Sequence, residues 1–143
     1  ECKSLVHEQH KRCITTLGSA PDVGRLNDRL VSVYKLWIEY VQHFPKTSRY
    51  TLGGKIDALF LECIELTFTA SYQPKDRKLP YLDKVTTRFD LLKFILRVSW
   101  ETKALDTKKY IALSEPLAEI GKMIGGWNNK IRKETQTPAG SRV

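Results

Sequence analysis

Apolar residues recur at alternating spacings of three and four in four separate segments of the chain. This spacing places side chains on one side of an α-helix, because the helix completes a turn about every 3.6 residues. No segment alternates apolar and polar residues with the period of two that a half-buried strand requires. The sequence therefore predicts an all-α protein with four long helices, whose apolar seams span residues 26–44, 52–70, 82–100 and 110–131.

Short connections separate the four predicted helices. Pro45 ends the first helix, because proline disfavours helical geometry in the residue before it, and Thr51 can cap the second. Pro80 suits the first turn of the third helix, and Asp106 is a natural N-cap for the fourth. Since short loops between long helices make neighbours antiparallel, we expect an up-down-up-down four-helix bundle.

The bundle is expected to occupy residues 26–133 of the 143-residue chain, a length that suits one domain. Residues 1–25 are expected to form an N-terminal extension, compatible with a short helix and a linker. Residues 134–143 are polar and are expected to be a flexible tail. Pro116 lies inside the fourth helix, where it is expected to kink or weaken the turn around Ala112, because it lacks a backbone donor and crowds the preceding turn.

Basic residues are unevenly distributed along the chain. The net charge is +8, and residues 72–143 carry 15 lysines and arginines against 8 acidic residues, whereas residues 1–71 carry 9 against 8. This asymmetry favours an acidic partner for the second half, either a phosphate backbone or an acidic protein face. The alternative interpretation is a generic solubilising surface.

Nine of these basic residues are candidates for contact with RNA, DNA or a protein partner. Pairs one helical turn apart present two charges to a row of phosphates, and arginine can fork onto a single phosphate. The three at the end of the fourth helix also suit the helix dipole, and any one of the nine can simply face solvent. The candidates are Arg77, Lys78, Lys84, Arg88, Lys93, Arg97, Lys130, Arg132 and Lys133.

The third predicted helix carries a second apolar stripe, roughly opposite its core seam. A helix that is apolar on two sides is buried on two sides, so the stripe predicts an oligomer interface. Single exposed apolar residues are common on protein surfaces, but four in one row favour an interface. The stripe consists of Leu91, Phe94, Val98 and Leu105.

Neither catalysis nor metal binding is indicated. The sequence has no glycine-rich phosphate loop after a strand and no nucleophile elbow. Four potential zinc ligands near the N-terminus do not follow a zinc-finger spacing, and one helix cannot enclose an ion; they are Cys2, His7, His10 and Cys13. We therefore expect a non-enzymatic protein with no metal and no cofactor.

Two further features bear on localisation. No apolar run approaches the roughly 20 residues of a membrane span, so no membrane partner is expected. Three cysteines, an odd number, suit a reducing compartment better than a disulfide framework. Together these features favour a cytoplasmic protein.

Several stretches of the sequence are characteristic of a known family. They are FPKTSRYTLG at 44–53, RKLPYL at 77–82, LLKFILR at 91–97 and LAEIGKMIGGW at 117–127. In this order they resemble the first interhelical turn, the third helix and the closing segment of the "four helix bundle protein" family. That family includes Avd, the accessory variability determinant of diversity-generating retroelements, and proteins encoded in intervening sequences of bacterial ribosomal RNA genes. The resemblance covers about residues 26–133.

The resemblance implies a bacterial or phage-encoded homo-oligomer, with a pentamer favoured. It also implies binding of a reverse transcriptase and of template RNA or cDNA, in support of mutagenic retrohoming. The chain has no polymerase motif of its own, so that chemistry would belong to the partner. The intervening-sequence branch of the family leaves a second interpretation open, a helical interaction or scaffold protein with no direct nucleic-acid role.

Overall fold

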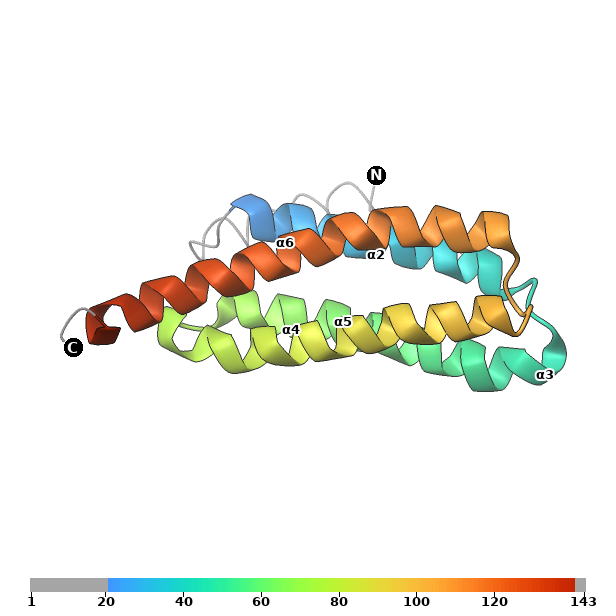
Figure 1. Ribbon diagram of the computed structural model, residues 1–143, viewed down its shortest axis with the longest axis horizontal. Coiled ribbons are helices and arrows are strands. Elements are labelled where there is room, and N and C mark those ends of the chain that lie inside the picture. The colour runs from blue at the N-terminus through green and yellow to red at the C-terminus, as the bar shows by residue number, and fades with distance from the viewer. Residues whose placement is uncertain (1–20, 141–143) are drawn as a thin grey trace, which may run out of the picture.

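A computed structural model of the chain describes residues 21–140, with side chains for residues 24–135 (Figure 1). It confirms the all-α prediction, because four long helices pack antiparallel to one another (Figure 1). The long helices are α2 (Pro21–Val41), α4 (Gly54–Tyr72), α5 (Lys78–Glu101) and α6 (Thr107–Gly140). The short segments are α3 (Lys46–Ser48) and η1 (Arg49–Gly53), between α2 and α4, and η2 (Lys75–Arg77), between α4 and α5.

Each long helix lies beside the next one in the chain, and α6 closes the bundle against α2. The α2–α4 and α5–α6 connections share one end, which we call the connection end (residues 42–56 and 97–110), and η2 lies at the opposite, turn end (residues 73–78 and 127–135) (Figure 1). One polar contact spans each side of the bundle: Tyr34 with Asp57, Glu62 with Arg88, Asp83 with Arg132, and Glu119 with Arg29.

The predicted seams form the hydrophobic core. Leu30 of α2 and Ile120 of α6, for example, have no exposed surface. The third seam differs from the prediction at its end, since Ser99 is fully buried and Trp100 is 37% exposed. The Ser99 hydroxyl is satisfied in the core because it donates to the carbonyl oxygen of Ile95 at 3.0 Å. Burial of a small hydroxyl residue therefore leaves the larger aromatic ring at the surface.

The outer helices extend beyond their predicted limits. α2 begins at Pro21, inside the segment expected to be an extension, and a proline is well tolerated in a first helical turn. α6 continues to Gly140, through most of the segment expected to be a tail. It also continues through Pro116, whose neighbour Leu117 is buried in the core. The first 20 residues, including the candidate zinc ligands, lie outside the described part of the chain.

The connection between α2 and α4 is closed by backbone contacts. The Arg49 guanidinium donates to the carbonyl oxygens of Gln42 and Phe44, at 2.9 and 3.3 Å, and so satisfies acceptors at the end of α2. Thr51 does not cap α4 as predicted, because its hydroxyl donates back to the carbonyls of the preceding turn. The residue before α4 is Gly53, where a Cβ atom would lie only 3.0 Å from a methyl carbon of Val41.

Candidate nucleic-acid interface

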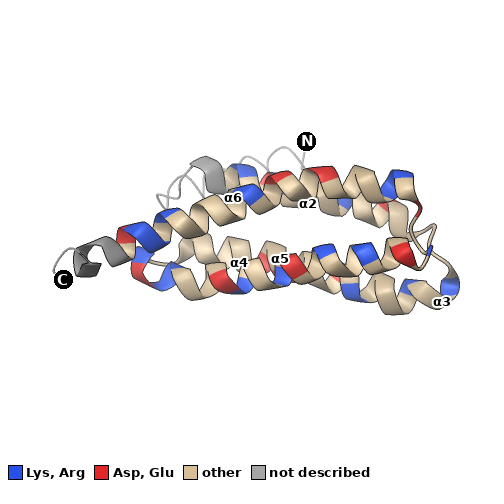
Figure 2. Cartoon of the chain, in the orientation of Figure 1, with Lys and Arg blue, Asp and Glu red and all other residues tan. Residues whose placement is uncertain are grey.

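The fold brings five of the nine predicted basic residues to the turn end. Lys75 in η2 forms an ion pair of 2.8 Å with Glu134 of α6, which holds η2 against the last third of that helix. Basic residues from both segments of the turn end therefore gather at one end of the bundle, although about 50 residues separate the two segments in sequence (Figure 2). We call this set the basic end, and it consists of Arg77, Lys78, Lys130, Arg132 and Lys133.

Lys78 has a structural contact that the sequence did not predict. Its ammonium group donates to the carbonyl oxygens of Ala70 and Ser71, at 2.8 and 3.3 Å, and lies 5.7 Å from the centroid of the Trp127 ring. A cation at this place satisfies orphan acceptors at the end of α4 and suits the helix dipole. Partial burial lowers the pKa of Lys78. This side chain is therefore engaged in holding α4, α5 and α6 together.

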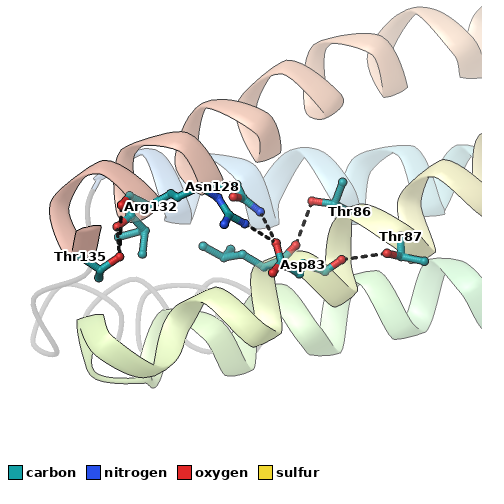
Figure 3. A network of polar contacts seen from close by, with 8 residues as sticks. Asp83, Thr86, Thr87, Asn128, Arg132 and Thr135 are labelled. Carbon is teal, nitrogen blue, oxygen red and sulfur yellow. Dashed lines mark hydrogen bonds and ion pairs between the residues drawn. The ribbon is translucent and has the colours of Figure 1, made fainter. Parts of the chain in front are cut away.

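Arg132 belongs to a polar cluster between α5 and α6 (Figure 3). The Asp83 carboxylate oxygen Oδ1 accepts hydrogen bonds from the Arg132 guanidinium and the Asn128 amide, each at 3.0 Å. The Thr86 and Thr87 hydroxyls donate to backbone carbonyls of α5 nearby. The cluster fixes the position of α6 relative to α5 at the turn end, and it neutralises part of the Arg132 charge.

Arg77 and Lys130 present their charges to solvent at the same end. The pKa of Glu134 lies below its ordinary value, first because Lys75 hydrogen-bonds to it and further because Lys75 and Lys130 are positively charged. The turn end is therefore a positively charged surface to which η2, α5 and α6 contribute.

The other four predicted cations lie along α5 and do not form one row. Arg88 faces α4, where its guanidinium lies 2.9 Å from the Glu62 carboxylate. Lys93 faces α6, because its ammonium group would lie 3.8 Å from a Cβ atom at Gly121. Arg97 lies one helical turn beyond Lys93 on the same side of α5, and it forms an ion pair of 3.0 Å with Glu101.

The carboxylates that pair with the exposed cations of α5 are easily replaced by another acidic group. Such pairs contribute only about 0–1 kcal/mol each to stability, because water and salt screen them. Lys93 is 3.6 Å from Asp90, and Lys84 is exposed on the outer surface of α5. The structure thus divides the predicted α5 cations into two flanks, Lys84 with Arg88 and Lys93 with Arg97.

The apolar stripe of α5 is shorter than the sequence indicated. Phe94 is 56% exposed, and the neighbouring Leu91 and Val98 are half-buried. Leu105 does not belong to the stripe, because α5 ends at Glu101 and the chain then returns toward the bundle. Leu105 is only 2% exposed and lies in the core.

Comparison with known proteins identifies a family relationship. A model of the bAvd-like family matches residues 25–131. The chain belongs to the bAvd-like family. No curated protein and no solved structure matches it.

The match confirms the family resemblance and covers nearly the whole bundle. It begins in α2 and ends in α6 at Ile131, one residue before Arg132. The family is that of bacterial Avd, the accessory variability determinant, so its members are accessory proteins of diversity-generating retroelements. Most of the basic end lies inside the matched region, and Arg132 and Lys133 lie just beyond it.

Other chemistry of this bAvd-like protein is limited in the described region. Residues 21–140 contain no helix long and apolar enough to span a membrane, and no group of three or more metal-ligand side chains. Cys63 is buried in the core, and burial raises the pKa of its thiol to about 12. A thiol with so high a pKa is a poor nucleophile, so Cys63 is a packing residue.

Apart from Arg97, residues at the connection end were not among the predicted contacts. Trp100 fits a spacing of four after Leu96, which placed it in the apolar seam, although Ser99 occupies the core instead. A signal was nevertheless present in the sequence, because residues 42–56 contain three cations and no carboxylate. The local excess of cations does not show in the charge of residues 1–71 as a whole, which is close to neutral.

Proposed function

We propose that this bAvd-like protein is a non-enzymatic accessory subunit that binds nucleic acid and the reverse transcriptase of a diversity-generating retroelement. The observation that carries the proposal is the gathering of basic residues at the turn end in a chain that matches the family along its bundle. The chemistry of cDNA synthesis belongs to the reverse transcriptase, and the bundle supplies a binding surface.

The turn end suits phosphate binding because its cations lie on segments that are in contact before binding. The Lys75–Glu134 ion pair links η2 to α6, and the Asp83 cluster links α5 to α6. Exposed side chains on this frame lose little backbone freedom when they contact a phosphate, so more of the electrostatic attraction is retained as affinity. Arg77 and Lys130 are the residues from which we expect direct contacts.

Binding through phosphates predicts weak dependence on base sequence and strong dependence on salt. Phosphate contacts position a protein on nucleic acid without reading its sequence. Each neutralised phosphate of a single strand releases counterions and contributes about −0.7 to the slope of log affinity against log salt concentration. Template RNA and cDNA would both satisfy these requirements.

We further propose that the chain assembles into a homo-oligomer, a pentamer by family resemblance, through the α5 stripe. Phe94, Leu91 and Val98 form an apolar ridge on the outer face of α5, and removal of a large apolar side chain from water stabilises by about 1.5–3 kcal/mol. Assembly would repeat the basic end once in every subunit. Several weak phosphate contacts would then act together on one nucleic acid.

One observation favours a second function, a scaffold without direct nucleic-acid binding. Carboxylates of this same chain already pair with four of the nine predicted cations, namely Arg88, Lys93, Arg97 and Arg132. A bundle whose charges are internally balanced can bind a protein through its apolar stripe alone. Gene context separates the two functions, since a reverse transcriptase gene with paired template and variable repeats supports the accessory role.

The direct experiment compares two double variants in binding of single-stranded RNA. Arg77→Ala with Lys130→Ala removes two exposed charges from the basic end, and Lys35→Ala with Lys122→Ala removes two exposed charges elsewhere. We expect the first pair to lose more affinity and to lower the salt slope by about 1.4, as two lost phosphate contacts require. Copurification with the reverse transcriptase tests the protein partner. Wild type that binds no RNA at low salt would support the scaffold function.

A further inference from the structure

The connection end carries a second basic region at the opposite end of the bundle from the proposed contacts. Residues 42–56 and 97–110 contain seven lysines and arginines against two carboxylates, Glu101 and Asp106, which gives a net charge of +5. The two segments lie at the same end of the bundle (Figure 1), and the ammonium group of Lys109 lies 5.8 Å from the centroid of the Tyr40 ring, just before the first segment. The seven cations are Lys46, Arg49, Lys55, Arg97, Lys103, Lys108 and Lys109.

An exposed and rigidly held indole lies within this basic region. Trp100 is 37% exposed, and its ring stacks on Tyr110 with 4.9 Å between centroids and 5° between planes. The indole N–H donates to the Thr107 hydroxyl at 3.0 Å, which joins the end of α5 to the start of α6. A ring fixed on two sides loses little conformational entropy when a ligand packs against its remaining surface.

The turn after Trp100 presents a lysine where glycine is usual. The N–H of Lys103 donates to the Trp100 carbonyl at 3.0 Å, and the N–H of Ala104 donates to the Ser99 carbonyl at 2.9 Å. These are the two hydrogen bonds of a Schellman motif, whose C′ residue takes a left-handed conformation and is usually glycine. Lys103 occupies that position with φ of 66°, the only non-glycine residue with positive φ in the described region. This conformation is strained for a residue other than glycine, and the exposed Lys103 side chain extends from the turn three residues after Trp100.

A second aromatic ring is exposed at the same end. Tyr50 in η1 is 83% exposed, the most of the large hydrophobic residues described, and its neighbours in sequence are Arg49 and Thr51. Exposed rings among cations are the elements with which proteins bind single strands, because every base has a face that can stack and every linkage carries a phosphate. Bases in a duplex are already stacked and cannot use these rings.

We propose that the connection end binds single-stranded nucleic acid, with an unpaired base stacked against Trp100 and adjacent phosphates on Lys103 and Lys108. This inference rests on the proposed nucleic-acid function and adds a second site with its own ligand class. Positive charge attracts the backbone, and the aromatic surface selects unpaired nucleotides over duplex. Template RNA and cDNA share this chemistry, so oligouridylate and oligothymidylate probes distinguish the two sources.

The test measures binding of fluorescent single strands of about 16 nucleotides, long enough for such sites, and of a duplex of equal length. Trp100→Ala is expected to weaken single-strand binding about tenfold, as loss of one stacked base predicts, and to leave duplex binding unchanged. Trp100→Phe keeps an aromatic face and is expected to restore most of the affinity. The matched control is Phe68→Ala, which removes a ring of similar exposure, 39%, that also contacts a tyrosine.

Lys103→Gly supplies a readout that a structural role alone would not give. Glycine relieves the left-handed strain, so the variant is expected to melt at a higher temperature than wild type. Its single-strand salt slope is expected to fall by about 0.7 through loss of one phosphate contact. Increased stability together with weaker binding supports the proposal.

Three results would overturn the inference while leaving the proposed function intact. These are wild-type binding that is unaffected by Trp100→Ala, equal losses in the Trp100 and Phe68 variants, and a change of oligomer mass in Trp100→Ala. The last result would make this surface an interface between copies of the chain. Wild type that binds neither strand nor duplex would instead overturn the proposed nucleic-acid function, and this site with it.

Discussion

Gly121 of α6 packs so closely against Phe89 of α5 that a Cβ atom on the glycine would lie 3.3 Å from the ring carbon Cε2. Gly125, one helical turn further along α6, has nothing within 4 Å of the corresponding position. Of the two glycines that the sequence places four residues apart, only the first permits close approach of the helices. The contact lies beside Lys93, so it also positions one flank of α5 cations.

The same substitution at these two glycines is expected to have different effects. Gly121→Val should destabilise the bundle by about 1–3 kcal/mol, because added carbons overpack the contact with Phe89. Gly125→Val should change stability by less than about 0.5 kcal/mol, because valine has a slightly higher helix propensity and meets open space. Urea denaturation measures both. Equal losses at the two positions would show that Gly121 does not limit the distance between α5 and α6.

Removal of Asp83 should affect stability and nucleic-acid binding in opposite directions. Asp83→Ala deletes the acceptor that joins Asn128 and Arg132 to α5, so we expect a loss of about 0.5–1.5 kcal/mol in stability. It also releases Arg132 and removes a negative charge from the basic end, so binding of RNA should become tighter. Asp28→Ala, on an exposed carboxylate of α2, makes the same change in net charge. Comparable gains in affinity from both variants would remove the special role of Asp83.

Asp106 should make the start of α6 sensitive to acid. Its pKa lies below the ordinary value of 3.8, first because its carboxylate accepts a hydrogen bond from the Lys109 backbone N–H, at 2.8 Å. This confirms the predicted N-cap. A carboxyl group whose pKa is lower in the folded state stabilises that state above its unfolded pKa, and this contribution disappears as the pH falls through the folded pKa. Asp106→Asn keeps a cap without the charge, so its melting temperature should depend less on pH below about 4.

Phe94 should control assembly. Phe94→Asp places a charge in the middle of the α5 stripe, and we expect light scattering to report a shift toward the monomer mass of 16.5 kDa. Ile111→Asp is the control, because Ile111 is 48% exposed on α6, away from the stripe. A wild-type protein that already has the monomer mass would contradict the proposed interface.

Periodicity predicted the helices because it reports which side of a helix leaves water. Leu30 and Ile120 were assigned to the core on spacing alone, and both are fully buried. The same reasoning failed at Trp100, since spacings of three and four are equally acceptable after Leu96, and only the tertiary structure selects Ser99. The predicted apolar stripe also assumed one helix through residues 91–105, whereas α5 ends at Glu101 and the chain reverses at Lys103.

The charged surface was less predictable than the core. A one-dimensional pattern does not show which carboxylate of another helix meets a given cation. Arg88 and Glu62 are 26 residues apart, and their ion pair depends on the register between α4 and α5. The turn end was partly predictable, because a short connection must bring Arg77 to one end of the bundle. An antiparallel bundle also brings the end of the fourth helix, with Lys130 and Arg132, to that end, but the pairing of Lys75 with Glu134 and of Asp83 with Arg132 depends on the register between the helices.

The helix α5 runs from the turn end to the connection end and so determines how far apart the two proposed contacts are. Its 24 residues, at about 1.5 Å each, measure about 36 Å. An oligonucleotide shorter than this span can occupy one end of a subunit at a time, while a longer one can reach both and gain the effective concentration of a tethered ligand. Affinity plotted against strand length would then rise in a step rather than smoothly, and the bundle would act as a ruler for the strand that it holds.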